Sequence, residues 1–236
     1  MGRTMTMPRP TSLELEFVPP LENGDRLTRA EFERRYEAMP ERVKAELIEG
    51  VVYLASPVRI AHHSSPEADL GGWLWVYMVD TPGTQVGHNG TVRLDRNNEP
   101  QPDVFIRIAP ERGGQSGTTS DDYVEGAPEL IAEVAASSAS IDLHAKLTAY
   151  HRNGAREYIV WRASDGELDW FAWRKERYER LMPDSSGVVK SEIFPGLWLD
   201  VPALLRRDLP KVLATLHEGL RSDEHSVFVK RLQASA

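Results

Sequence analysis

Two short apolar segments that each carry one carboxylate constrain this chain more than any other feature. The first reads Pro102-Asp103-Val104-Phe105-Ile106, and the second reads Glu129-Leu130-Ile131-Ala132-Glu133-Val134. Their apolar and β-branched composition predicts two short strands. A carboxylate inside an apolar strand is costly to bury unless it is paired or binds a metal. Asp103 and Glu133 are therefore the leading candidates for a functional site.

Both carboxylates also have simpler explanations. Glu133 could face solvent or pair with a lysine or arginine, because half-buried strands often carry one polar face. Asp103 follows a proline, and a Pro-Asp pair also suits the entry to a strand.

A helix is expected over 139–152, directly after the second strand. Leu143, Leu147 and Tyr150 recur at helical spacing, and Asn153-Gly154 ends the pattern. Asp142 and Lys146 lie four residues apart on one helical face. Spacing alone favours a solvated ion pair of about 0.3–0.5 kcal/mol. The position of Lys146 after the Glu133 strand is what makes it a candidate for the site.

The remaining pattern predicts an α/β fold in which helices flank a mixed central sheet and antiparallel hairpins are added. Thr28-Arg29-Ala30-Glu31 forms a capping box at the start of a helix. Glu49-Gly50 between two apolar runs predicts a tight turn. Other expected elements are a helix from about 64 to 79, a hairpin of 91–94 with 102–108, a long loop over 110–126, a strand over 157–161, a hairpin of 168–173 with 177–181, and a helix over 211–220.

We expect three parts along the 236 residues. Residues 1–25 are rich in proline and predict a flexible N-terminal arm. Residues 26–205 are expected to form the main α/β domain. Residues 206–236 are expected to hold a C-terminal helix and a loose tail.

Composition limits the classes of partner. The net charge of −8 argues against tight non-specific binding to DNA, so a DNA site would need a local patch or bound metal. The absence of cysteine excludes thiolate chemistry and fits a cytoplasmic protein. The longest apolar stretch, Leu70 to Val79, is too short to span a bilayer, so no membrane partner is expected.

Metal-assisted phosphodiester cleavage requires residues of the types predicted here: one acid on each of two strands and a lysine on the following helix. Carboxylates hold a divalent cation, which polarises the phosphate and lowers the pKa of an attacking water. Mg²⁺ prefers one or two protein carboxylates and keeps several waters.

An ordered series of motifs resembles the Uma2 family of the PD-(D/E)XK restriction-endonuclease-like superfamily, over roughly Arg26 to Leu205. The series comprises Glu46-Leu47-Ile48-Glu49-Gly50, Ser56-Pro57 followed by His62, Pro102-Asp103-Val104, Pro128 to Val134, Asp142-x-x-x-Lys146, and Gly154-Ala155-Arg156-Glu157-Tyr158. The resemblance implies cleavage of DNA with Mg²⁺, or with Mn²⁺. It also implies that Asp103 and Glu133 are metal ligands, that Glu46 completes the metal site, and that Lys146 assists the attacking water.

The chain departs from the superfamily pattern at Ala135, which stands where the motif lysine would be. The resemblance implies that Lys146 replaces that lysine from the following helix. His62 matches a position that the family often fills with histidine, and we expect at most an accessory role for it.

Three functions remain open. A metal-dependent deoxyribonuclease predicts that the acids and Lys146 converge in a cleft with basic walls, for which the candidates are Arg93, Arg107, Arg152 and Arg156. The acidity and Ala135 favour a non-catalytic binding or regulatory domain that keeps the fold. A two-carboxylate hydrolase acting on a sugar would need a roomy groove and no metal. A homodimer is compatible with the first function, because double-strand cutters often act as symmetric dimers.

Overall fold

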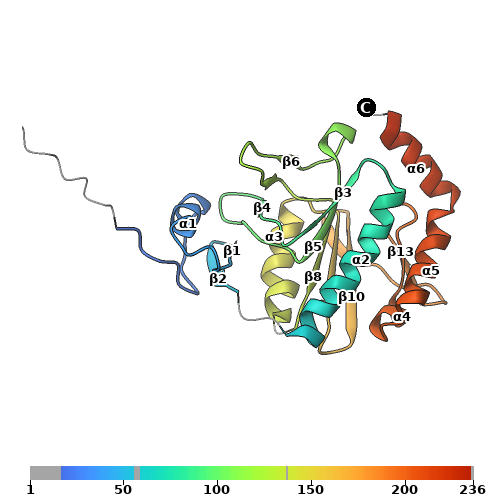
Figure 1. The fold of residues 1–236 in the computed structure, drawn as a ribbon, viewed down its shortest axis with the longest axis horizontal. Helices are drawn as coiled ribbons and strands as arrows, with labels where there is room; N and C mark the ends of the chain where they lie inside the picture. The colour runs from blue at the N-terminus through green and yellow to red at the C-terminus, as the bar shows by residue number, and fades with distance from the viewer. Residues whose placement is uncertain (1–16, 56–58, 137, 235–236) are drawn as a thin grey trace, which may run out of the picture.

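The computed structural model describes residues 17–55, 59–136 and 138–234, and its centre is a six-stranded mixed sheet. The strands lie in the order β11-β10-β9-β8-β5-β3, and Figure 1 labels β10, β8, β5 and β3 of this sheet. Neighbours β8 and β9 run parallel, and the other pairs are antiparallel. The bounds are β3 Thr84–His88, β5 Val104–Ile108, β8 Leu130–Val134, β9 Glu157–Arg162, β10 Glu167–Arg174 and β11 Arg177–Arg180.

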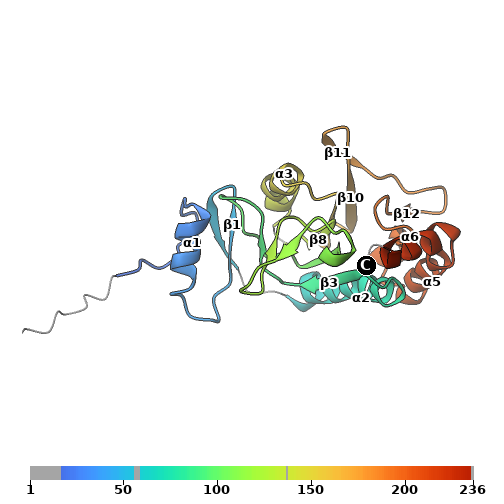
Figure 2. The same ribbon diagram turned by 90° about the horizontal axis from the view of Figure 1, so that it is seen from above.

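The middle strands are buried on both faces. Every residue of β5 and of β8 is buried, which explains why both read as continuous apolar runs. Helix α2 (Ser65–Asp80) packs Leu70, Trp73 and Tyr77 on one face. Helix α3 (Leu147–Arg152) packs Tyr150 on the other, and Figure 2 shows the two helices on opposite sides of the sheet. The predicted α/β architecture is therefore confirmed.

Both helices are entered through a wider, π-helical turn. Residues Ile60–Ser64 precede α2, and Ile141–Lys146 precede α3. Gly154 has a φ of 83°, a conformation that favours glycine, and it follows the end of α3 as predicted. π-Helical turns often occur at functional sites, and here each one carries a candidate site residue.

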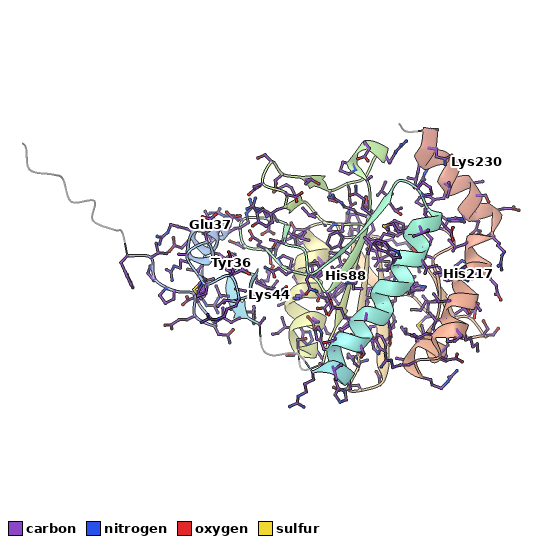
Figure 3. The ribbon with its side chains drawn as sticks, viewed as in Figure 1. Tyr36, Glu37, Lys44, His88, His217 and Lys230 are labelled. Carbon is purple, nitrogen blue, oxygen red and sulfur yellow. The ribbon has the colours of Figure 1, made fainter. Side chains whose placement is uncertain are left out.

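The N-terminal unit is a helix and a hairpin at one end of the molecule. It consists of α1 (Arg29–Tyr36), β1 (Ala45–Ile48) and β2 (Val51–Leu54), with Tyr36 and Lys44 labelled in Figure 3. Both turn residues, Glu49 and Gly50, have positive φ angles of 52° and 74°, so the predicted tight hairpin is confirmed. The Thr28 side chain caps no backbone group, so the capping box is not formed.

The expected hairpin of 91–94 with 102–108 is wrong. Strand β4 (Val92–Arg93) pairs in parallel with β7 (Val124–Glu125), which pairs with β6 (Gly117–Thr118) inside the expected loop. Strand β5 instead pairs antiparallel with β8 on one side and with β3 on the other, and the sequence of β3, TQVGH, lacks an apolar pattern. A Cβ on Gly87 of β3 would lie 2.2 Å from the Phe105 ring, so packing requires glycine at this position. Glycine is unfavourable in a strand, which makes β3 hard to identify from the sequence.

The C-terminal part packs against the sheet more fully than expected. Its elements are β12 (Val188–Lys190), β13 (Trp198–Asp200), α4 (Val201–Leu205), α5 (Leu209–Leu220) and α6 (Asp223–Ala234). Helix α6 replaces the expected loose tail, because His225, Phe228 and Leu232 recur at helical spacing and are buried. The division at residues 25 and 205 stays a prediction, and residues 1–16 of the expected arm lie outside the described ranges.

None of the helices in the described ranges combines the length and the apolar character that a membrane crossing requires.

Glu157 ties the C-terminal part to the sheet. This fully buried carboxylate on β9 accepts hydrogen bonds from Trp170 Nε1 at 3.1 Å, Ser191 Oγ at 2.8 Å, and the backbone N–H groups of Glu192 and Ile193 at 2.6 and 3.3 Å. We expect Glu157→Ala to lower the free energy of unfolding by about 3 kcal/mol or more, because it leaves several buried donors without an acceptor. Urea denaturation measures this loss.

The matched control is Glu167→Ala on the adjacent strand, whose side chain is exposed. We expect a change of about 0.5 kcal/mol or less there. Equal losses for the two variants would show that Glu157 has no anchoring role.

Candidate active site

Asp103 and Glu133 lie opposite each other at adjacent strand ends. Val104 of β5 pairs with Ala132 of β8 in an antiparallel register. Asp103, which precedes Val104, therefore lies opposite Glu133, which follows Ala132. The Val134 N–H donates to Asp103 Oδ2 at 2.7 Å, and the Asp103 N–H lies 3.4 Å from Glu133 Oε2. The antiparallel register therefore brings together two carboxylates that are 30 residues apart in sequence.

Lys146 reaches the same point from the helix that follows β8. Its Nζ lies 2.9 Å from Glu133 Oε1 and 3.0 Å from Glu46 Oε1. Glu46 comes from β1 of the N-terminal hairpin, and the Gln101 N–H donates to its Oε1 at 2.6 Å. All four residues predicted for the site are thus neighbours, although their roles stay predictions.

Asp142 and Lys146 do not form the solvated ion pair that spacing alone favours. Asp142 is buried, its Oδ1 lies 3.8 Å from Lys146 Nζ, and its Oδ2 accepts from Ser138 Oγ at 2.5 Å. Tyr150, one turn after Lys146, donates its hydroxyl to Glu133 Oε1 at 2.8 Å. Sequence reasoning assigned Tyr150 only to the packing face of the helix.

His63, not His62, faces the site. His63 Nε2 lies 3.5 Å from Asp103 Oδ1, and its Nδ1 lies 3.7 Å from Glu67 Oε2, whereas His62 is exposed. The spacing of His63 and Glu67 with the buried Leu70 and Leu74 could have identified the inward residue. The neighbouring Ser56-Pro57 motif lies outside the described residues.

Glu67 is itself held at the rim of the site. Asn89 Nδ2 donates to Glu67 Oε1 at 2.7 Å, and His88 Nδ1 lies 3.8 Å from the same oxygen. Gly71 makes room for this arrangement, because a Cβ there would lie 2.0 Å from His88 Cε1. His88 is labelled beside α2 in Figure 3.

The site has an inner and an outer layer. The side chains of Glu133, Asp142 and Lys146 are 3–7% exposed, whereas those of Asp103, His63, Glu67 and Glu46 are 13–23% exposed. A ligand from solvent would therefore meet the outer group first.

Negative charge exceeds positive charge in this setting. Burial raises the pKa of Glu133 well above its usual range, and the other carboxylates add to the rise. Burial also raises the pKa of Asp103 from 3.8 to about 6. Burial disfavours the ammonium of Lys146, but the surrounding carboxylates outweigh it and raise its pKa, so Lys146 stays charged.

The donor set fits a divalent cation. Ligand atoms of His63, Glu67 and Asp103 all lie within 4.8 Å of one another, and His63 Nδ1 is buried with no hydrogen-bond partner in the described part of the chain. Within the same residues, Glu46 and Glu67 each have one oxygen held by a donor and a second oxygen that accepts no hydrogen bond. Carboxylate oxygens suit Mg²⁺ and Mn²⁺, and an imidazole nitrogen suits transition metals.

The candidate basic walls are largely neutralised. Arg93 contacts Glu33, Glu99 and Asp121, and Arg152 pairs with Glu49 and Asp95. Arg107 is buried and donates to Gln85, Thr118 and the Gly117 carbonyl. Arg156 is exposed and lies over the Trp173 ring. Acidic partners therefore neutralise Arg93 and Arg152, and Arg107 is buried, whereas Arg156 is exposed and forms no ion pair within the described residues.

Burial makes the ionised form of Asp103 unfavourable, so a substitution that removes this charge is expected to stabilise the metal-free protein. A carboxyl group whose folded pKa is raised adds stability below its ordinary pKa of 3.8 and loses it as pH rises through about 6. We therefore expect Asp103→Asn to raise the free energy of unfolding of the metal-free protein at pH 8 by up to about 3 kcal/mol, at 1.36 kcal/mol per pKa unit. The gain should vanish near pH 4.

Urea denaturation at both pH values measures it, with exposed Asp122→Asn as the matched control. A loss of stability at pH 8 in Asp103→Asn alone would contradict this account of the site.

Comparisons with known proteins identify a family and a similar fold. The model of the Uma2 family, described as "Putative restriction endonuclease", matches residues 29–202. A crystal structure described as a "putative nuclease belonging to DUF820" from Anabaena variabilis has a similar fold, with a TM-score of 0.56 and 12% identity over 73% of this chain and 96% of that chain. No curated protein matches the sequence. Since the family match spans well over half of the chain, the protein belongs to the Uma2 family of restriction-endonuclease-like proteins.

Proposed function

We propose that this protein is a metal-dependent endonuclease that hydrolyses phosphodiester bonds of DNA. The convergence of Asp103, Glu133 and Lys146 at two adjacent strand ends carries the proposal. Membership of a family described as restriction endonucleases supports a nucleic-acid substrate.

Asp103, Glu133 and Glu46 are the proposed metal ligands, and His63 and Glu67 extend the donor set on the solvent side. A divalent cation bound there would polarise the scissile phosphate and lower the pKa of the attacking water. Asp103 is the shared member, because it contacts both Glu133 and His63. Mg²⁺ suits the carboxylates, and Mn²⁺ suits a set that includes an imidazole.

Lys146 assists the attacking water through its charge. Its ammonium lies among Glu133, Glu46 and Asp142, and these carboxylates raise the pKa of Lys146, which favours the role of a fixed positive charge over that of a general base. A fixed positive charge beside the carboxylates keeps them in place and stabilises negative charge on an incoming hydroxide.

A non-catalytic binding domain is the second candidate. The observation that favours it is the pairing of Arg93 and Arg152 with acidic residues, which removes positive charge that DNA would need. This candidate predicts neither metal-dependent cleavage nor loss of function when Glu133 is replaced.

Cleavage of plasmid and single-stranded DNA with Mg²⁺ or Mn²⁺ tests the proposal. We expect the wild type to cut, EDTA to stop it, and Glu133→Ala to lose the activity while it remains folded. The fold is checked by circular dichroism. A wild type that binds metal without cutting either DNA would favour the binding domain.

The two adjacent histidines provide an internal comparison. We expect His63→Ala to weaken Mn²⁺ binding by at least about tenfold and Mg²⁺ binding less, because an imidazole is a better ligand for a transition metal. His62→Ala should leave both affinities unchanged, since His62 is exposed. Calorimetric titration of the wild type and both variants with each metal measures these affinities. Equal effects of the two substitutions would remove His63 from the ligand set.

A further inference from the structure

Tyr150 and Lys146 hold the same oxygen of Glu133. The Tyr150 hydroxyl donates to Glu133 Oε1 at 2.8 Å, and Lys146 Nζ donates to it at 2.9 Å. The other oxygen, Oε2, faces the strand end of Asp103, and among the described residues its one hydrogen-bond contact is the long one of 3.4 Å to the Asp103 N–H. The two donors therefore distinguish the two oxygens of this carboxylate.

From this geometry we propose that Tyr150 is a positioning residue that orients Glu133 so that Oε2 is left for a divalent cation. The inference rests on the proposed function, because it assigns the cation to the same site. Groups that hydrogen-bond to a ligating carboxylate orient it and tune the affinity of the metal.

Lys146 alone cannot impose this orientation. Its Nζ lies 3.0 Å from Glu46 and 3.8 Å from Asp142 as well as near Glu133, and a lysine side chain has a flexible stem. Tyr150 has a single hydroxyl proton, and Glu133 is the partner to which it is donated.

The ring of Tyr150 is held rigidly enough to act in this way. It is fully buried and packs edge-on against Tyr158, with ring centroids 5.0 Å apart. The backbone of α3 carries it one turn beyond Lys146, so both donors approach Glu133 from one helix. A tyrosine used only for packing would not need its hydroxyl at this carboxylate.

Tyr158 is a matched control. It is equally buried in the same cluster, but its hydroxyl donates at 3.1 Å to the backbone carbonyl of Asp142 and not to a carboxylate. Tyr158→Phe removes the same atom from the same aromatic cluster and leaves Glu133 with both of its donors.

The experiment is Mn²⁺ binding followed by electron paramagnetic resonance in the wild type, Tyr150→Phe and Tyr158→Phe. We expect Tyr150→Phe to weaken binding about 10- to 100-fold, the range for loss of a group that orients a ligand. Tyr158→Phe should stay within about twofold of the wild type. Circular dichroism and thermal unfolding confirm that the variants are folded.

Equal affinity in Tyr150→Phe and the wild type, or equal losses in both variants, would overturn the positioning role. A wild type that binds no Mn²⁺ would overturn the cation site itself, whereas binding without DNA cleavage would count only against the nuclease function. If Tyr150→Phe does not fold, bound Mn²⁺ should still broaden the ring signals of Tyr150 in the labelled wild type, and unbroadened signals would contradict the proposal.

Discussion

A single buried ammonium group connects the parts of this molecule that form the site. Lys146 Nζ lies within 4 Å of carboxylate oxygens from β1, from β8 and from its own helix. Without that charge, Glu133 and Asp142 would be buried acids with no cation beside them. Removal of one partner from a buried ion pair typically costs about 3–5 kcal/mol. The Lys146 ammonium therefore links the N-terminal hairpin, through Glu46, to the end of the central sheet that carries Glu133.

This arrangement leaves more negative than positive charge, and the imbalance links structure to function. Burial and mutual repulsion raise the carboxyl pKa values of Asp103 and Glu133. An ion pair with a purely structural role has equal numbers of positive and negative groups. This cluster has more carboxylates than cations, so a further cation would stabilise it. Clusters of this kind occur at functional sites because the fold stabilises them from elsewhere. In this protein, the buried core on both faces of β5 and β8 supplies that stability.

Much of the site could be predicted from sequence because apolar strands reveal a misplaced acid. Asp103 and Glu133 stand out against buried neighbours, and the helix that carries Lys146 has a clear period. The helical spacing of His63 and Glu67 with Leu70 and Leu74 carries the signal that His63 rather than His62 turns inward, whereas the family resemblance points to His62. Strand β3 was missed because Gly87 is required by the Phe105 ring, and packing of that kind depends on residues distant in sequence. The ion pairs that neutralise Arg93 and Arg152 likewise depend on partners brought together only by the fold.

The acidic cluster around Asp103 and Glu133 is proposed as a cation site. Anomalous diffraction from crystals of the wild-type protein grown with Mn²⁺ tests this assignment. We expect an anomalous peak at ligand distance, about 2.0–2.4 Å, from Asp103 and from at least one of Glu133, Glu67 and His63. A well-ordered site with no peak there, or with the metal bound only elsewhere, would contradict it.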